Sequence, residues 1–532
     1  MYLVATPLPF QRLKVYNNMK KIFVLILISC SVNVFSQDWP VKRLVTAKKQ
    51  TSARFTVLPV FNFVASKILS QRGTYQELKL DPSFLDQLMH QKPEALQLSI
   101  PVSKSKNIVC DLVQFSLGNI KYTENNDGII DNVKIPVTYR GTVSGEQAVN
   151  NVMLTVNEDY LSLVVSMEDK VLQFTKADET DKAMYRLYNS ATLQFPIVPV
   201  ECGNRDNPTR TTANGISING ERTPSPTAVQ DKCINVFVDC FDSLFINQAR
   251  SKQKTIDFVY ELFNSVGTGY YNDSINIQIT TINVWTSADP YRGDTRENAL
   301  YDLGNQWKDN FWGNICVGLD FGTNGRSGLA GDIGRIKAVA ANTCPAFKYG
   351  GADTLSACCY NDLNYTKNVQ NFPVGPNITG SQVYLVMHEM GHLLGSSHTK
   401  WCGWKLTSNP DTFGAIDSCG AVEGSCAKGA PPGPGGGTIM SYCGNAPMFI
   451  GFNNGFGKLP GTAIRNFVNQ SACVLNCSDC FGLLNLNKNK EANNIAATAP
   501  GQNNKTRGSR LPAHTKESSE SKLPITSQKP EQ

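Results

Sequence analysis

The sequence predicts a strand-rich N-terminal domain followed by an α/β domain built on a mainly parallel sheet. Two observations predict this. Between residues 37 and 200, short runs of β-branched and aromatic residues are broken by Gly, Asn and Asp. From Cys233 onward, strand-like runs alternate with helical ones, which is typical of a parallel sheet with helices on its faces. The chain of 532 residues, 41% hydrophobic and 18% charged, has room for about two to four domains with their own cores.

In the first domain, residues 37–201, the runs "KIPVTYRGTV", "NVMLTV" and "YLSLVVSM" predict strands, and we find no catalytic cluster there. Residues 202–230 are rich in Asn, Thr, Pro and Gly and predict a linker with protease-accessible arginines. The second domain, residues 231–480, opens with a buried strand, "CINVFVDC". A helix from about 246 to 264 and a second strand, "INIQITTINVW", follow. A helix capped by Thr295 and strands in "NICVGLDFG" and "GLAGDIGRIKAVA" come next. Residues 481–532 have few apolar anchors, which predicts disorder.

The N-terminus carries a secretory signal. Residues 1–36 include "MKKIFVLILISCSVNVFS", with two lysines, a short apolar run and a small residue before the expected cleavage after Ser36. Translation starting at Met19 would keep every part of this signal. The competing interpretation is a bacterial lipobox, "LISC", that would anchor the protein to lipid through Cys30. The apolar run is too short to cross a bilayer, and no later segment is long enough. We therefore expect a secreted protein without a membrane span.

The charge distribution argues against a nucleic-acid partner. The net charge of +6 comes from the two ends, because the chain between residues 37 and 480 has a net charge of −2. Nucleic-acid-binding proteins concentrate positive charge on their folded part.

Of the sixteen cysteines, fifteen remain after the signal, many of them between Cys202 and Cys480. Export permits disulfides, and an odd number leaves at least one thiol unpaired or bound to something else.

Three of the five histidines lie within "HEMGHLLGSSH". The preceding residues predict a helix capped by Thr379 or Ser381. Positions four apart share a helix face, so His388 and His392 can bind one zinc ion.

Glu389 is then placed to take the proton of a water on the metal. Gly395 ends the helix, and the reversed chain can bring His398 to the same metal. Three nitrogen ligands and an open fourth position indicate a catalytic zinc. A chance HExxH on a solvated helix is the alternative, and the full eleven-residue pattern makes it improbable.

These residues resemble the metzincin zinc peptidases, in which the extended zinc motif is followed by a Met-turn. "GGGTIMSYC" supplies that turn, with Met440 as its methionine. The order of "DPYRGDTRENALYDLGNQW", "GLAGDIGRIKAVAANTC" and the zinc motif is similar to the reprolysin (adamalysin) family over residues 231–480. The resemblance implies a twisted, mostly parallel sheet whose antiparallel edge strand lines the cleft and pairs with extended substrate.

Two positions depart from the reprolysin pattern. Thr399 stands where an aspartate is usual, so another group must fill that local role. Tyr442, two residues after Met440, matches the tyrosine of astacins and serralysins, which implies a catalytic role near the metal; a packed tyrosine is the alternative.

The glycine-rich residues 429–437 lack the Lys-Ser/Thr of a phosphate-binding loop. Cys402, Cys419, Cys426 and Cys443 bracket this segment, and we expect disulfides there of unknown pairing.

The resemblance also implies an inhibitory prodomain over residues 37–201 and an activation site in the linker. Cys202 could occupy the open zinc position, and Cys110 is the alternative thiol. For either cysteine, the competing interpretation is a structural disulfide.

We therefore expect a secreted zinc endopeptidase made as a zymogen, with one catalytic zinc ion and protein or peptide substrates. Calcium binding is possible but not indicated by the sequence, and the oligomeric state stays open. The alternatives are a secreted, disulfide-rich adhesion or binding module without turnover, and an enzyme that hydrolyses a non-peptide amide.

Overall fold

The computed structural model describes residues 39–477, apart from residues 52–54, 69–73, 147–149, 168–169, 178–180, 190–200, 203–231, 309, 323–326, 338–356, 365–379, 409–410, 433–435 and 446–453. The expected signal segment with Cys30, almost all of the linker and the tail from residue 481 lie outside the described residues.

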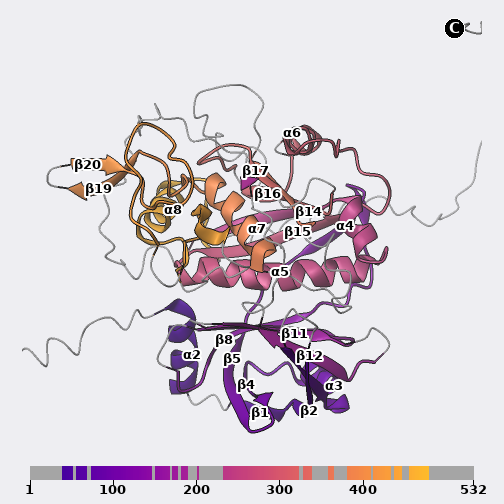
Figure 1. Cartoon of the computed structure of the whole chain (residues 1–532). Coiled ribbons are helices and arrows are strands. Elements are labelled where there is room, and N and C mark those ends of the chain that lie inside the picture. Colours follow the sequence, from indigo (N-terminus) through magenta and orange to yellow (C-terminus); the bar gives the residue numbers. More distant parts are fainter. Residues whose placement is uncertain are drawn as a thin grey trace, which may run out of the picture. The chain divides into compact units, whose positions relative to one another are not determined.

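The N-terminal region forms a ten-stranded sheet, coloured indigo to purple in Figure 1. Its strands lie in the order β1-β4-β5-β8-β9-β10-β11-β12-β3-β2, and all pairs are antiparallel except β1 with β4. Two helices and the ten strands make up this part: α2 (Pro40–Gln50), β1 (Thr56–Pro59), β2 (Phe61–Ile68), β3 (Thr74–Leu80), α3 (Pro82–Gln91), β4 (Ala95–Ser103), β5 (Lys106–Gln114), β8 (Val137–Val143), β9 (Asn151–Val156), β10 (Leu161–Ser166), β11 (Val171–Lys176) and β12 (Met184–Asn189).

The second region is built on an eight-stranded sheet in the order β13-β17-β18-β16-β14-β15-β6-β7. The five strands from β18 to β6 run parallel, and β17 is antiparallel to β18. The strands are β6 (Lys121–Glu124), β7 (Gly128–Ile129), β13 (Glu201–Cys202), β14 (Cys233–Cys240), β15 (Asn276–Val284), β16 (Ile315–Asp320), β17 (Ser327–Ala330) and β18 (Cys358–Asp362). A separate hairpin pairs β19 (Trp404–Ser408) with β20 (Asp411–Gly414).

The structure differs from the expected domain organisation at both edges of this sheet. Strands β6 and β7 belong to the N-terminal half of the sequence, yet β6 pairs with β15. Strand β13, at the start of the expected linker, pairs with β17 at the other edge. An edge strand exposes unpaired N–H and C=O groups, and here segments from before residue 203 satisfy them at both edges.

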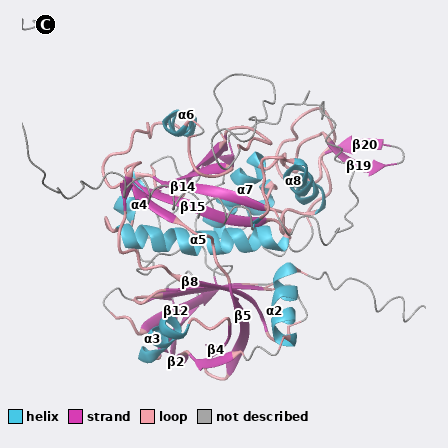
Figure 2. Ribbon diagram, turned by 180° about the vertical axis from the view of Figure 1, so that it is seen from behind, coloured by secondary structure: helices cyan, strands magenta, loops and turns pink. Residues whose placement is uncertain are grey.

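Helix α5 (Lys252–Asn272) lies between the two sheets (Figures 1 and 2), contacting β8 and β9 on one side and β15 on the other. The sequence predicted one helix from about 246 to 264. The structure instead has a short helix, α4 (Asp242–Asn247), and then α5. Ala249 and Arg250, which lie between α4 and α5, both have φ of 55°, and this left-handed backbone interrupts the helix. The side chain of Ser251 then accepts a hydrogen bond from Lys254 N and caps α5.

The remaining helices are α6 (Arg296–Trp307), α7 (Gly380–Leu393), the 3₁₀ turn η3 (Tyr442–Asn445) and α8 (Lys458–Gln470). Thr295 caps α6 as the sequence predicts, accepting from Asn298 N at 3.1 Å. Ser381 lies inside α7, and Thr379 is outside the described residues. Thirteen consecutive residues of α7, Ser381–Leu393, are buried, and the helix contacts α5 and the strands β16, β17 and β18. No helix in the described part of the chain is long and apolar enough to cross a membrane.

Candidate metal centre

Helix α7 places two of the three clustered histidines. His388 and His392 lie one turn apart and are almost completely buried. Gly395 then ends the helix with φ of +97°, and its N–H donates to the carbonyl of His392 at 2.8 Å. A side chain at Gly395 would also meet Phe467, whose Cβ lies 3.1 Å from the position a Cβ would take. The reversal after this glycine brings His398 back beside the helix.

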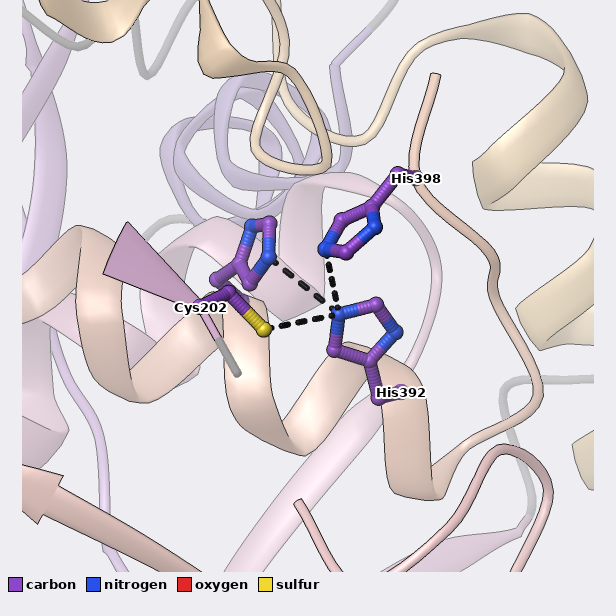
Figure 3. Close-up of side chains that lie close together, drawn as sticks. Cys202, His392 and His398 are labelled. Atoms are coloured by element: carbon purple, nitrogen blue, oxygen red, sulfur yellow. Dashed lines mark hydrogen bonds between the residues drawn. The ribbon is translucent and has the colours of Figure 1, made fainter. Parts of the chain in front are cut away.

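The three imidazoles point their Nε2 atoms at one another. His392 Nε2 lies 3.2 Å from His388 Nε2 and 3.1 Å from His398 Nε2. Figure 3 shows His392 and His398 in this arrangement, together with Cys202.

The other ring nitrogens fix the tautomers. His388 Nδ1 lies 2.7 Å from the carbonyl of Ile439, and His392 Nδ1 lies 2.8 Å from the carbonyl of Ser396. A carbonyl oxygen only accepts, so Nδ1 carries the proton and Nε2 presents a bare lone pair.

Burial keeps these rings neutral. It lowers the pKa of His388 to about 3 and the pKa of His392 well below the ordinary value, and neighbouring histidines add to the effect. Burial also lowers the pKa of His398. Neutral imidazole is the form that binds a metal. Bare lone pairs about 3 Å apart repel one another, and a cation between them removes the repulsion. Two ligands at 2.0–2.1 Å from a tetrahedral zinc lie about 3.3 Å apart, so the histidines fit that ion.

Glu389 lies beside the cluster with its carboxylate completely buried. Its Oε1 has no hydrogen-bond partner among the described residues. Burial raises the pKa of this carboxyl to about 8, although a hydrogen bond from the Cys202 thiol works in the opposite direction. A Cβ at Gly328 would come within 2.3 Å of Oε1, so glycine lets strand β17 pass this close to the carboxylate.

Cys202 completes a set of four metal-ligating side chains. Its Sγ lies 3.5 Å from His392 Nε2 and donates to Glu389 Oε2 at 3.5 Å. The candidate ligand atoms of Cys202, His388, His392 and His398 all lie within 4.8 Å of one another. The residue is held there by β13, which pairs in parallel with β17 through Cys202 and Gly328. The alternative thiol, Cys110, is buried in the core of the N-terminal sheet and contacts none of these residues.

Met440 lies in a tight turn beneath the histidines and is completely buried. A Cβ on Gly391 would lie 2.7 Å from Met440 Sδ, so the turn packs directly against α7. Thr399, found where an aspartate was expected, bonds to this turn: its N–H and hydroxyl donate to the Met440 carbonyl at 3.0 and 3.3 Å. Thr399 thus ties the third histidine to the turn.

Tyr442 follows in η3 and faces β13, the strand that carries Cys202. Its hydroxyl donates to the Cys202 carbonyl at 3.1 Å, and its ring centroid lies 5.0 Å from that of His398. Lys400 Nζ lies 3.3 Å from the centre of the tyrosine ring.

Glu423 belongs to the site but was not predicted from the sequence. Glu423 places both carboxylate oxygens 3.0 Å from His398 Nδ1. The segment after His398 offers several acidic residues, and nothing in their spacing distinguishes Glu423. Two disulfides hold this segment, Cys402–Cys426 and Cys419–Cys443, and a third joins Cys233 to Cys477.

Residues 230–452 match the family model Reprolysin_5, described as metallo-peptidase family M12. This segment belongs to that metallopeptidase family. The family implies a bound metal, usually zinc, and peptide or protein substrates. Among solved structures, the metalloproteinase-II of Bacteroides fragilis is 12% identical, with a TM-score of 0.33, covering 57% of this chain and 81% of that one. A chaperone–substrate complex is also 12% identical, with a TM-score of 0.24 and coverages of 46% and 36%. Scores this low support no conclusion about the metallopeptidase. No curated protein matches the chain.

Proposed function

We propose that this protein is a secreted zinc endopeptidase made as a zymogen. The observation that carries the proposal is the convergence of three bare Nε2 atoms beside the buried carboxylate of Glu389, with His392 Nε2 3.2 Å from that of His388 and 3.1 Å from that of His398. His388, His392 and His398 would hold the zinc. The three disulfides between described cysteines and the N-terminal signal pattern support an oxidising destination outside the cytoplasm.

When bound, zinc would supply a Lewis acid that polarises the scissile carbonyl and lowers the pKa of a water. Glu389 would accept the proton of the attacking water and deliver it to the leaving amine. Its unpartnered Oε1 is the atom available for this transfer. A pKa raised by burial also suits a group that must bind and release a proton near neutral pH.

Peptides are the substrates that the edge strand favours. β17 already hydrogen-bonds an extended segment, β13, directly beside the histidines. A substrate strand could replace β13 on the same backbone groups, which is β-augmentation. Met440 would support the metal site from below as the Met-turn.

The test is a casein or gelatin assay of the activated protein with and without a metal chelator, together with Glu389→Ala. We expect the chelator to abolish cleavage. Glu389→Ala should lower turnover by about 100- to 10,000-fold because the general base is lost. Zinc content should be unchanged, since the three histidines remain. Near-normal turnover of this variant with zinc bound would contradict the mechanism.

Latency is assigned to Cys202. A thiolate is a strong zinc ligand, and the Cys202 sulfur lies where it would fill the open position. Residues 37–201 would then act as the prodomain and the linker would hold the activation site. Tyr442 now donates to the Cys202 carbonyl, and its hydroxyl would become available to a substrate oxyanion once this segment leaves.

Cys202→Ala should therefore raise the peptidase activity of the uncut protein, because alanine cannot coordinate zinc. Cys110→Ala is the matched control: it removes a thiol from the N-terminal core, far from the histidines, and should leave the uncut protein latent. Activity of both proteins is measured on a quenched fluorescent peptide. Unchanged latency of Cys202→Ala would assign inhibition to the bulk of the N-terminal region alone.

A further inference from the structure

The third histidine is supported differently from the other two. His388 and His392 project from α7, and backbone carbonyls face their Nδ1 atoms. His398 lies on the reversed chain after the helix. Both oxygens of the Glu423 carboxylate lie 3.0 Å from its Nδ1. The carboxylate is on the opposite side of the ring from Nε2, so it cannot compete for the metal.

Glu423 is itself held on several sides. Its N–H donates to the Lys400 carbonyl at 3.0 Å, and its own carbonyl accepts from Cys402 N at 3.0 Å. The disulfide Cys402–Cys426 closes this short ladder. Lys400 Nζ lies 3.3 Å from Glu423 Oε1, and both side chains are mostly buried, with exposures of 11% and 15%. The backbone and the disulfide therefore fix the position of the carboxylate.

We propose that Glu423 is a positioning residue that orients His398 and makes its Nε2 a stronger ligand. A carboxylate that accepts the Nδ1 proton fixes the ring orientation and tautomer, and increases electron density at the opposite nitrogen. This role depends on the proposed zinc site. It also explains how the ring of His398, which lies outside the helix, is held in an orientation that directs its Nε2 at the same metal as His388 and His392.

The test measures zinc affinity by competition with a chelating dye in the full secreted chain with Cys202 intact. Glu423→Ala should weaken zinc binding by about 10- to 100-fold. Glu423→Gln should weaken it less, because the amide oxygen still accepts the Nδ1 proton but carries no charge. Asp411→Asn is the matched control. It removes a carboxylate paired with Lys405 in the neighbouring hairpin, and should leave zinc affinity unchanged.

Two further readouts separate positioning from general stability. The loss of the ion pair with Lys400 should lower the thermal midpoint of metal-free Glu423→Gln, and the further rise in midpoint on adding zinc should be smaller for this variant than for the parent. The visible absorption bands of the cobalt-substituted protein should shift in this variant, because they report ligand strength at the metal.

The outcomes are distinguishable. If both Glu423 variants bind zinc within about twofold of the parent, the positioning role is wrong and the zinc site stands. If the parent itself binds no zinc at the three histidines, the proposed function fails and this inference fails with it. If Glu423→Ala does not fold, the affinity and cobalt spectrum of Glu423→Gln decide the matter.

Discussion

Gly391, between the two helical histidines, leaves no room for a side chain. A Cβ there would lie 2.7 Å from Met440 Sδ and 3.0 Å from Phe456 Cε1. Glycine to alanine inside a helix normally stabilises by about 1 kcal/mol. Overpacking a core costs about 1–3 kcal/mol, so the crowding should win here. We expect Gly391→Ala to lower the thermal midpoint of the metal-free protein.

A double variant provides the control for Gly391. With Met440→Ala as background, only the close approach to Phe456 remains for the added methyl group, and the cost of Gly391→Ala should shrink. A higher midpoint for Gly391→Ala in the parent background would show that the turn around Met440 yields easily, contrary to this prediction.

Residues whose partners lie on one helix or at its end could be predicted from the sequence, and others could not. The spacing of His388 and His392 and the glycine stop before His398 follow from helix geometry, and the structure brings these rings together. Glu423 reaches His398 across a disulfide-linked loop, where sequence spacing says nothing about direction. The substitution at Thr399 was visible, but its bond to the Met440 carbonyl required the folded turn.

At the scale of elements, strand existence was easier to predict than strand partners. Alternating and β-branched runs identify a strand from its own residues. The pairing of β6 with β15 joins residues about 160 positions apart, and nothing within β6 specifies that partner. The break between α4 and α5 was missed because two non-glycine residues adopt left-handed backbone there.

Helix α5 presents a carboxylate to the N-terminal sheet region, and this contact predicts a pH dependence. Asp257 accepts from Asn157 Nδ2 and Gln253 Nε2, both at 2.8 Å. Burial raises the pKa of Asp257 to about 7, although the hydrogen bonds from Gln253 and Asn157 work in the opposite direction. An unfolded aspartate titrates near 3.9. The folded state therefore binds more protons between these values, and its stability falls as pH rises from about 4 through about 7.

Asp257→Asn cannot ionise, so it should flatten the decline in thermal midpoint between pH 5 and pH 8. Asp411→Asn, an exposed carboxylate of the hairpin, should leave the slope as it is in the parent. The measurement is the midpoint of thermal unfolding at several pH values in one ionic strength. An identical slope for Asp257→Asn and the parent would remove Asp257 as its source.

At the scale of the whole protein, the N-terminal region holds the second sheet at three places. β6 pairs with β15 at one edge, β13 pairs with β17 at the other, and the sheet around β8 and β9 packs on α5. The α5 contact is largely polar: Asn264 Nδ2 donates to the Leu154 carbonyl at 3.1 Å, and Asn272 Nδ2 donates to Asn151 at 2.7 Å. A polar contact of this kind suits two parts that must later separate in water.

This arrangement predicts that cutting the linker is not sufficient for activation. A cut within residues 203–230 leaves Cys202 at the end of the N-terminal piece, which is still bound through β6 and α5. Among the described residues two pairs hold β13 on β17, and the other contacts keep the cysteine at high effective concentration. A sequence-specific protease site placed in the linker allows the cut to be made cleanly. After cutting, the two pieces should coelute on size exclusion and remain nearly inactive, and activity should appear when the N-terminal piece is removed with mild denaturant or by digestion.

The cut Cys202→Ala protein is the control, because its pieces should also coelute but be active at once. Immediate full activity of the cut parent, with its pieces still together, would mean that the cysteine leaves the metal as soon as the chain is broken.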